Sequence, residues 1–454
     1  MSRLNKIAFF LICAVGVVTT LAYGTVHQPV IALFYLAVAA LALIFVMDSL
    51  LSGTIKVSVS RLQIPLLLLG LFAIVQTIPF GSLTDSAVVS GTPRTISLEP
   101  FATRVVAVHI FALSTFFLVT TSILDTAGRI RRLVNVLTIF GFGYAFFAIL
   151  QSVLSPDKIY GIYQPMAGVP FGSFVNRHDF AAIMEMTIAL PLGLLFTGAL
   201  RSDKRLVYIV AIAIMGASLL LSGSRGGLVA LSAEIILLII LTSKPKGTKS
   251  ILLKSALSLA LVAAAVAGAV FVGGDTSLTR FSETAGSDNV TSSRTQIWSV
   301  TLKVITQNLP FGAGLGAFPQ AYAQFDPAGG YERVEQAHND YLQIVADAGI
   351  VGAIIGCLFL VWFFRKGIKN AASSNQFRRG VAVGAFAGCL AILAHSLFDF
   401  VLHITAVAVM FLTLLGLLIA SGREYEDDVD EYDVPKRKRR RSASVTPIQP
   451  NLKS

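Results

Sequence analysis

Long apolar runs recur along the whole chain, and they constrain its fold more than any other feature. A transmembrane helix needs roughly 20 predominantly apolar residues. About twelve such runs can be marked, at 7–26, 28–47, 62–80, 103–124, 133–154, 179–200, 206–222, 226–242, 250–273, 341–364, 380–400 and 402–420. Apolar residues make up 55% of the chain and charged residues only 13%, whereas soluble domains are about a quarter charged. The sequence therefore predicts an all-α polytopic transmembrane helical bundle of about 12 spans, although 206–222 and 226–242 are short for separate spans.

The distribution of Lys and Arg predicts the orientation of the bundle. With both termini in the cytoplasm, most of the 36 Lys and Arg residues fall in inner segments, as the positive-inside rule expects. The net charge of +11 is then mainly a feature of topology, and a nucleic-acid partner is disfavoured. The last segment, 421–454, is predicted to be a disordered basic cytoplasmic tail whose run 436–441 lies on anionic membrane lipids. The first apolar run lacks a clear cleavage site and is predicted to be a retained helix.

The cysteines give no sign of redox or metal chemistry. Cys13, Cys357 and Cys389 all fall within apolar runs and show no CxxC spacing. They are predicted to be packing residues, without a disulfide or a metal. No internal repeat is visible.

The longest hydrophilic segment, 274–340, is predicted to be a periplasmic loop containing short helices. Apolar residues near helical spacing between Arg294 and Asn308 predict a helix along the membrane interface, anchored by Trp298. After Pro310, the glycines of 312–316 predict a flexible turn. This GxGxG does not follow a strand, so a dinucleotide fingerprint is rejected.

His338 ends this loop, immediately before an apolar run. A neutral imidazole accepts a proton near neutral pH, so His338 is the candidate catalytic base, with Asn339 and Asp340 beside it as supporting residues. The alternative is a loop histidine that is bonded to a backbone carbonyl.

Arginines in the outer segments are candidate ligands for a phosphate group. Arg225 lies in Ser222-Gly223-Ser224-Arg225-Gly226-Gly227, where small residues leave backbone N–H groups accessible to an anion and Ser224 is a supporting residue. The alternative is a snorkelling arginine at a tight hairpin. Arg177 and Arg294 are further candidates for a diphosphate clamp, or else interfacial anchors or ion-pair partners; Arg280 and Arg333 are weaker candidates.

The last outer segment contains a row of polar residues. His395, Asp399 and His403 follow one another at intervals of four, which would place them on one helical face if the helix continued. A zinc pair or proton relay is conceivable, but HxxxD without a further ligand is a weak metal signal. A structural polar network is the favoured interpretation, with His395 and Asp399 as supporting residues.

Metal- and nucleotide-dependent chemistry is disfavoured by missing motifs. The outer carboxylates are scattered and form no DxD pair, and no P-loop appears. A diphosphate would therefore be bound by arginines without a metal, and no cofactor is expected.

In this order, the motifs resemble the O-antigen ligase and O-antigen polymerase superfamily. The resemblance covers residues 95–420, within a transmembrane domain of 1–420. It is carried by Ser222–Gly227, Arg294 with Trp298, Pro310–Gly314, His338-Asn339-Asp340-Tyr341-Leu342 with Gly349, and His395–Phe400.

The resemblance implies a multi-pass glycosyltransferase of the bacterial inner membrane with a periplasmic active site. Members transfer a glycan from an undecaprenyl diphosphate donor to an acceptor hydroxyl, without metal or nucleotide. The family's histidine matches His338 and its phosphate-binding arginines match Arg225 and Arg294. Arg177 corresponds only approximately, because relatives often show Asn-x-Asn-x-x-Ala where this chain has Asn176-Arg177-His178-Asp179-Phe180-Ala181.

Two questions about function stay open at this level. The segment Ile96–Pro100 resembles exopolysaccharide-cluster relatives and favours polymerisation of O-antigen or exopolysaccharide, with ligation to lipid A core as the alternative. Both use the same chemistry, and polysaccharide-assembly proteins are possible partners. A transporter or flippase of lipid-linked saccharides is the alternative from another class; it would predict inverted repeats and broken mid-membrane helices.

Overall fold

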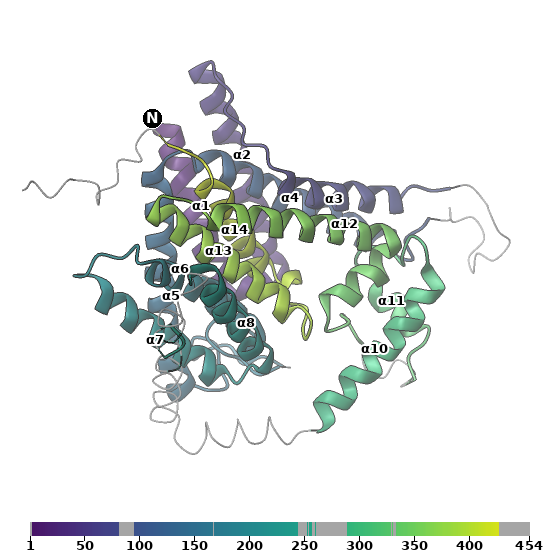
Figure 1. Cartoon of the computed structure of the whole chain (residues 1–454). Coiled ribbons are helices and arrows are strands. Elements are labelled where there is room, and N and C mark those ends of the chain that lie inside the picture. The colour runs from purple at the N-terminus through teal and green to yellow at the C-terminus, as the bar shows by residue number, and fades with distance from the viewer. Residues whose placement is uncertain are drawn as a thin grey trace, which may run out of the picture.

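The computed structural model confirms an all-α polytopic bundle (Figure 1). It describes residues 2–80, 95–166, 168–243, 288–327, 329 and 333–425, with 252, 254–256 and 259; for 288–293 only the backbone is described. In these residues it has no strand, only two isolated bridges in the 159–174 loop. The expected span 250–273 lies almost wholly outside the described residues, as do 81–94, Arg280 and the tail beyond Tyr425.

The elements follow one another along the chain with short connections. They are α1 (Arg3–Leu21), η1 (Tyr23–Thr25), α2 (Gln28–Ser52), η2 (Arg61–Gln63), α3 (Ile64–Gln76), α4 (Pro100–Ile123), α5 (Ala127–Leu154), α6 (Arg177–Thr197), α7 (Arg205–Ser222), α8 (Arg225–Thr242), α10 (Asp288–Asn308), α11 (Phe318–Ala323), α12 (Asp340–Ala371), α13 (Gln376–His395), η3 (Val401–His403) and α14 (Thr405–Ser421).

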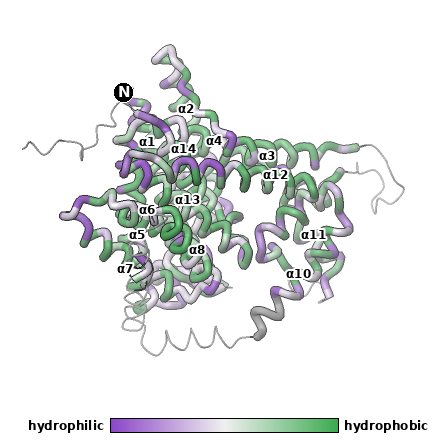
Figure 2. Tube along the Cα trace, viewed as in Figure 1, coloured by the Kyte–Doolittle hydropathy of each residue, from purple (hydrophilic) through white to green (hydrophobic). Residues whose placement is uncertain are grey.

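Nine of the helices in the described part of the chain are long and apolar enough to cross a membrane. α7 and α8 are two of them, so the short runs at 206–222 and 226–242 do form separate helices. α3 and α14 are shorter apolar helices, and the predicted number of spans is therefore only approximate. Figure 2 shows that hydrophobic residues dominate the bundle helices, while hydrophilic residues gather towards helix ends and connections.

α6 and α13 form the centre of the bundle, and small residues bring them close together. A Cβ on Gly193 would lie 2.5 Å from the backbone oxygen of Gly380 and 2.5 Å from the nitrogen of Gly384. Glycine interfaces of this kind let membrane helices approach closely and gain van der Waals contact. The close contact makes these two helices a rigid frame for the residues at their ends.

α12 is interrupted at Gly349, which has φ +59° and ψ −145°. This conformation is essentially restricted to glycine, and a Cβ on Gly349 would lie 2.1 Å from the backbone oxygen of Pro310. Gly312 packs against the other side of the break, where its Cβ would lie 2.4 Å from the oxygen of Asp347. The prediction of a flexible turn at 312–316 is therefore wrong, because these glycines permit tight backbone packing.

α10 and α11 form a small layer beside the start of α12, set apart from the main bundle (Figure 1). The helix expected after Arg294 exists, but it begins earlier, at Asp288. Trp298 does not depend on the membrane for a partner, since its Nε1–H donates to the backbone oxygen of Ala337 at 3.0 Å. The three cysteines are free thiols.

Candidate active site

Five segments that are distant in sequence meet at one end of the bundle. Hydrogen bonds or ion pairs link the starts of α6, α8 and α12, the middle of α10, and the segment 396–403 between α13 and α14. The site is therefore built from helix ends and a loop, both supported by the packed helices.

Asp399 is the centre of this cluster and is almost fully buried, with 2% of its surface exposed. His338 Nδ1 lies 3.1 Å from its Oδ1, and Arg294 NH2 donates to its Oδ2 at 3.3 Å. The backbone N–H of Phe400 also donates to Oδ1, and His178 Nε2 lies 3.9 Å from Oδ2. Burial alone would raise the pKa of Asp399, but the hydrogen bond from His338 and the charges of His178 and Arg294 hold it well below its usual range.

His338 is held from both sides in a strained backbone conformation. Its φ is +50°, a value uncommon for residues other than glycine, which costs on the order of 1–3 kcal/mol. The preceding residue, Ala337, accepts from Trp298 and donates its N–H to Gln343 Oε1 at 2.7 Å. The imidazole keeps 32% of its surface exposed and touches the ring of Phe400 edge-on. It is therefore both fixed and accessible.

Asn339 and Asp340 attach the segment 396–403 to the start of α12. Asn339 caps the helix by accepting from two backbone N–H groups, and its amide donates to the oxygen of Leu397 at 2.9 Å. Asp340 accepts from Ser396 Oγ at 2.7 Å and lies 2.8 Å from His403 Nδ1. Burial would lower the pKa of His403, but the hydrogen bond and charge of Asp340 raise it above its usual value. Both residues fix the loop that carries Asp399.

Ser224 and His178 join the starts of α8 and α6. Ser224 caps α8 by accepting from the N–H of Gly227 at 3.1 Å. Its Oγ also lies 2.8 Å from His178 Nδ1, while the other ring nitrogen of His178 faces Asp399. His178, whose role the sequence left in doubt, thus lies between the Ser224 cap and the central carboxylate.

The three candidate arginines occupy different positions around this cluster. Arg294 contacts Asp399 directly and is one quarter exposed. Arg177 lies one residue before His178, with its guanidinium beside Gly223, where a Cβ would approach NH1 to 3.3 Å. Arg225 is the first residue of α8, is exposed, and forms no ion pair with any residue described here. Arg294 is thus within the cluster, and the other two border it.

His395 and His403 do not form the predicted row with Asp399. α13 ends at His395, because the oxygens of Ser396 and Leu397 accept from the N–H of Asp340 and the amide of Asn339. These tertiary hydrogen bonds replace the next helical turn. The prediction of one continuous helical face is therefore wrong.

His395 instead forms a separate buried pair inside the bundle. Its Nδ1 lies 2.9 Å from Glu185 Oε1, and both side chains are fully buried. The sequence analysis missed Glu185, although an acidic residue within an apolar run is a signal for a buried polar partner. Among the described residues, no group of three His, Cys, Asp or Glu is placed to hold a metal ion.

Comparison with known proteins identifies one family. Residues 210–357 match the family model described as O-antigen ligase, which is about a third of the chain. The match includes Arg225, Arg294 and His338, whereas His178 and Asp399 lie outside it. No curated protein matches the chain.

Proposed function

From the O-antigen ligase family domain at residues 210–357, which confirms the resemblance read from the motifs, we propose a specific glycosyl transfer reaction. The family makes the chain a membrane enzyme of the O-antigen ligase or polymerase type. The proposed donor is a glycan on undecaprenyl diphosphate, and the proposed acceptor is a sugar hydroxyl. Transfer takes place at the periplasmic face of the inner membrane, with both termini in the cytoplasm.

The observation that carries this proposal is the shared contact of His338 and Arg294 with Asp399. A carboxylate only accepts hydrogen bonds, so the imidazole nitrogen that faces it carries the proton. The other nitrogen, Nε2, is then free of a proton and can act as a base. Arg294 places a positive charge beside the same carboxylate, where a developing anion would be stabilised.

The bond changes follow from these positions. His338 Nε2 takes the proton of the acceptor hydroxyl while its oxygen forms a bond to the anomeric carbon. The bond between that carbon and the diphosphate oxygen breaks, and its electron pair leaves with the diphosphate. A single direct displacement inverts the anomeric centre. General-base assistance of this kind contributes about 10²–10⁴-fold in rate.

The arginines replace a metal as the counter-charge for the leaving group. Guanidinium groups bind phosphate oxygens through paired hydrogen bonds. Arg294 is the principal ligand because it lies in the cluster. Arg177 and Arg225 extend the positive charge along the starts of α6 and α8, where backbone N–H groups also favour an anion.

Acceptor choice determines the biological product. We favour a second lipid-linked repeat as acceptor, which gives polymerisation of O-antigen or exopolysaccharide. Lipid A core as acceptor would give ligation by the same bond changes.

The test is transfer by purified full-length protein in proteoliposomes, with a synthetic undecaprenyl diphosphate glycan as donor. We expect a new glycosidic linkage with inverted configuration, detected by mass spectrometry and NMR. His338→Ala is expected to lower the rate at least 100-fold, and Arg294→Lys to lower it strongly because a lysine loses the bidentate geometry. Linking the glycan to lipid A core instead of a second repeat would identify a ligase.

His27→Ala is the matched control for the base. His27 contacts the rings of Tyr23 and Tyr163 and none of the residues around Asp399. Its rate should stay close to wild type. Movement of the donor across the bilayer without a new linkage would contradict the proposal in favour of a transporter, and normal rates in His338→Ala would remove the base.

A further inference from the structure

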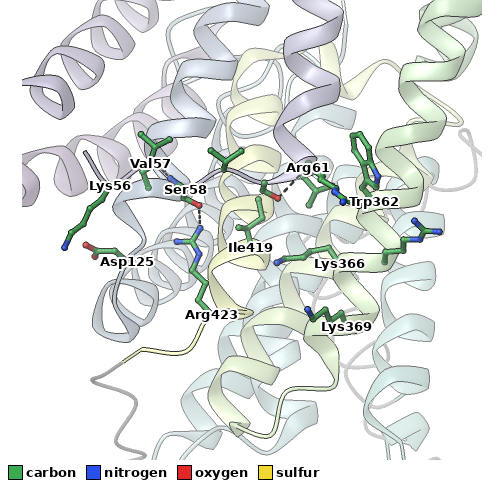
Figure 3. Close-up of a pocket in the computed structure, with 15 residues that line it drawn as sticks. Lys56, Val57, Ser58, Arg61, Asp125, Trp362, Lys366, Lys369, Ile419 and Arg423 are labelled. Atoms are coloured by element: carbon green, nitrogen blue, oxygen red, sulfur yellow. Dashed lines mark hydrogen bonds between the residues drawn. The ribbon is translucent and has the colours of Figure 1, made fainter. Parts of the chain in front are cut away.

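A second polar site lies at the opposite end of α12 from His338. Trp362, Lys366 and Lys369 follow Asp340 by more than 20 residues on this helix, which corresponds to more than about 30 Å of helix. Here the structure has a cavity of about 790 Å³ between the C-terminal half of α12, the ends of α4 and α14, and the extended segment before η2 (Figure 3). The cavity therefore opens near the other membrane surface.

Positive charge dominates the lining of this basic pocket. Six cationic side chains line it: Lys56, Arg61, Arg365, Lys366, Lys369 and Arg423. Figure 3 shows that they come from three separate parts of the chain, with Lys366 and Lys369 on α12 and Arg423 just after α14. Such a concentration of like charge is unfavourable unless an anion is bound.

The described residues do not neutralise this charge. Asp125 is the only acidic residue in the lining, and it pairs with Arg129 at 2.7 Å, which is not part of the pocket. Arg423 is held by the backbone oxygens of Thr121 and Leu124. The remaining five cations form no ion pair with any residue that the structure describes.

The pocket also has apolar and aromatic walls. Trp362, Leu62 and Ile419 contribute to its lining, and tryptophan is enriched where membrane helices reach the lipid headgroups. Basic pockets between transmembrane helices bind anionic lipid headgroups through phosphate contacts, while the apolar wall accommodates the lipid stem. A free phosphate would leave this apolar wall without a partner.

We propose that the basic pocket binds the phosphate headgroup of an anionic phospholipid, with Arg61, Lys366 and Lys369 as its principal ligands. The alternative occupant with matching charge is the acidic segment 424–433, which directly follows Arg423 in the sequence. An acidic peptide satisfies the cations but not the apolar wall, so the lipid is favoured.

The chain offers a built-in reporter for the test, because Trp298 and Trp362 are its only tryptophans. In full-length Trp298→Phe protein, the single remaining tryptophan lines the pocket. Brominated acyl chains quench tryptophan fluorescence on close approach. The protein is reconstituted in phosphatidylcholine with increasing phosphatidylglycerol, and quenching by brominated phosphatidylglycerol is compared with quenching by brominated phosphatidylcholine.

We expect phosphatidylglycerol to be preferred, and the preference to fall about fivefold for each lysine removed in Lys366→Gln and Lys369→Gln. The matched control is Lys204→Gln, an exposed lysine in the turn before α7 that does not line the pocket. It should leave the preference unchanged. Equal quenching by both lipids, or a preference that survives loss of both lysines, would overturn the proposal.

Two further arms distinguish the other sources of negative charge. If millimolar inorganic phosphate abolishes the preference, the pocket is a site for a soluble anion and the lipid proposal fails. If the preference appears only after Glu424, Glu426, Asp427, Asp428 and Asp430 are changed to their amides, the chain's own acidic segment is the occupant. A preference that both treatments leave intact supports the lipid.

Discussion

Replacing Asp399 with Asn tests the candidate site most directly, because the change keeps the shape of the side chain and removes its charge. The carboxylate accepts from both His338 and Arg294. An amide has one accepting oxygen and one donating nitrogen. One of the two partners must therefore lose its acceptor in Asp399→Asn.

The geometry sets the expected size of the effect. Removing one partner of a fully buried ion pair costs about 3–5 kcal/mol. Arg294 and His338 are 25% and 32% exposed, so solvent screening reduces the expected loss of folding free energy to about 1–3 kcal/mol. The rate should fall further, by about 10²–10³-fold, because the imidazole is no longer held with its proton on Nδ1. That factor corresponds to about 3–4 kcal/mol of transition-state stabilisation.

The assay is single-turnover transfer, with thermal unfolding measured on the same preparation. We expect kcat to fall while KM changes little. The double variant His338→Ala/Asp399→Asn should be no slower than His338→Ala alone, because a positioning residue has no role without the group that it positions. Glu335→Gln is the control, since its exposed pair with Arg333 is expected to contribute little. Rate losses that multiply in the double variant would refute the positioning role of Asp399.

Three further outcomes are expected. Gly349→Ala should destabilise the fold by about 2–4 kcal/mol through strain and overlap, measured as a lower unfolding temperature, whereas Gly356→Ala on the same helix, with open space around it, should be nearly neutral. The raised pKa of His403 means that its pair with Asp340 stabilises the fold below about pH 6.5 and loses this contribution as the pH rises through the folded-state pKa; His403→Asn should therefore lower the unfolding temperature more at pH 6 than at pH 9, and an equal loss at both would contradict the pairing. Transfer should persist in excess EDTA, because arginines neutralise the diphosphate in the proposed mechanism; complete loss of activity that added divalent metal restores would show that a metal is required.

The membrane architecture was predictable because hydrophobic length is a local property of the sequence. The runs at 206–222 and 226–242 each became a helix, α7 and α8. The mistakes arose where tertiary contacts decide the local structure. The 312–316 glycines suggested flexibility, yet Gly312 packs on the α12 break at Gly349. The spacing from His395 to His403 suggested one helix, yet Asn339 and Asp340 hydrogen-bond to the segment where it ends.

The residue types of the site were visible in the sequence, but their pairings were not. His338 and Arg294 were identified from their places in the outer loop. Nothing in the sequence linked either of them to Asp399, which lies 61 residues after His338 and 105 after Arg294. Glu185 and His395 are separated by 210 residues. Pairings over such separations depend on helix packing, which periodicity alone does not specify.

The end of α13 is the structural step on which the site depends. A continuous helix through 395–403 would keep Asp399 on the helical face that His395 occupies, directed towards α6 and Glu185. Because the chain leaves the helix after His395, Asp399 turns towards the loop from α10 to α12 and meets both Arg294 and His338. The bonds from Asn339 and Asp340 to this segment hold it there. The residues that follow His338 thus place the carboxylate that holds His338, and disruption at either end of this contact should affect the imidazole and Arg294 together.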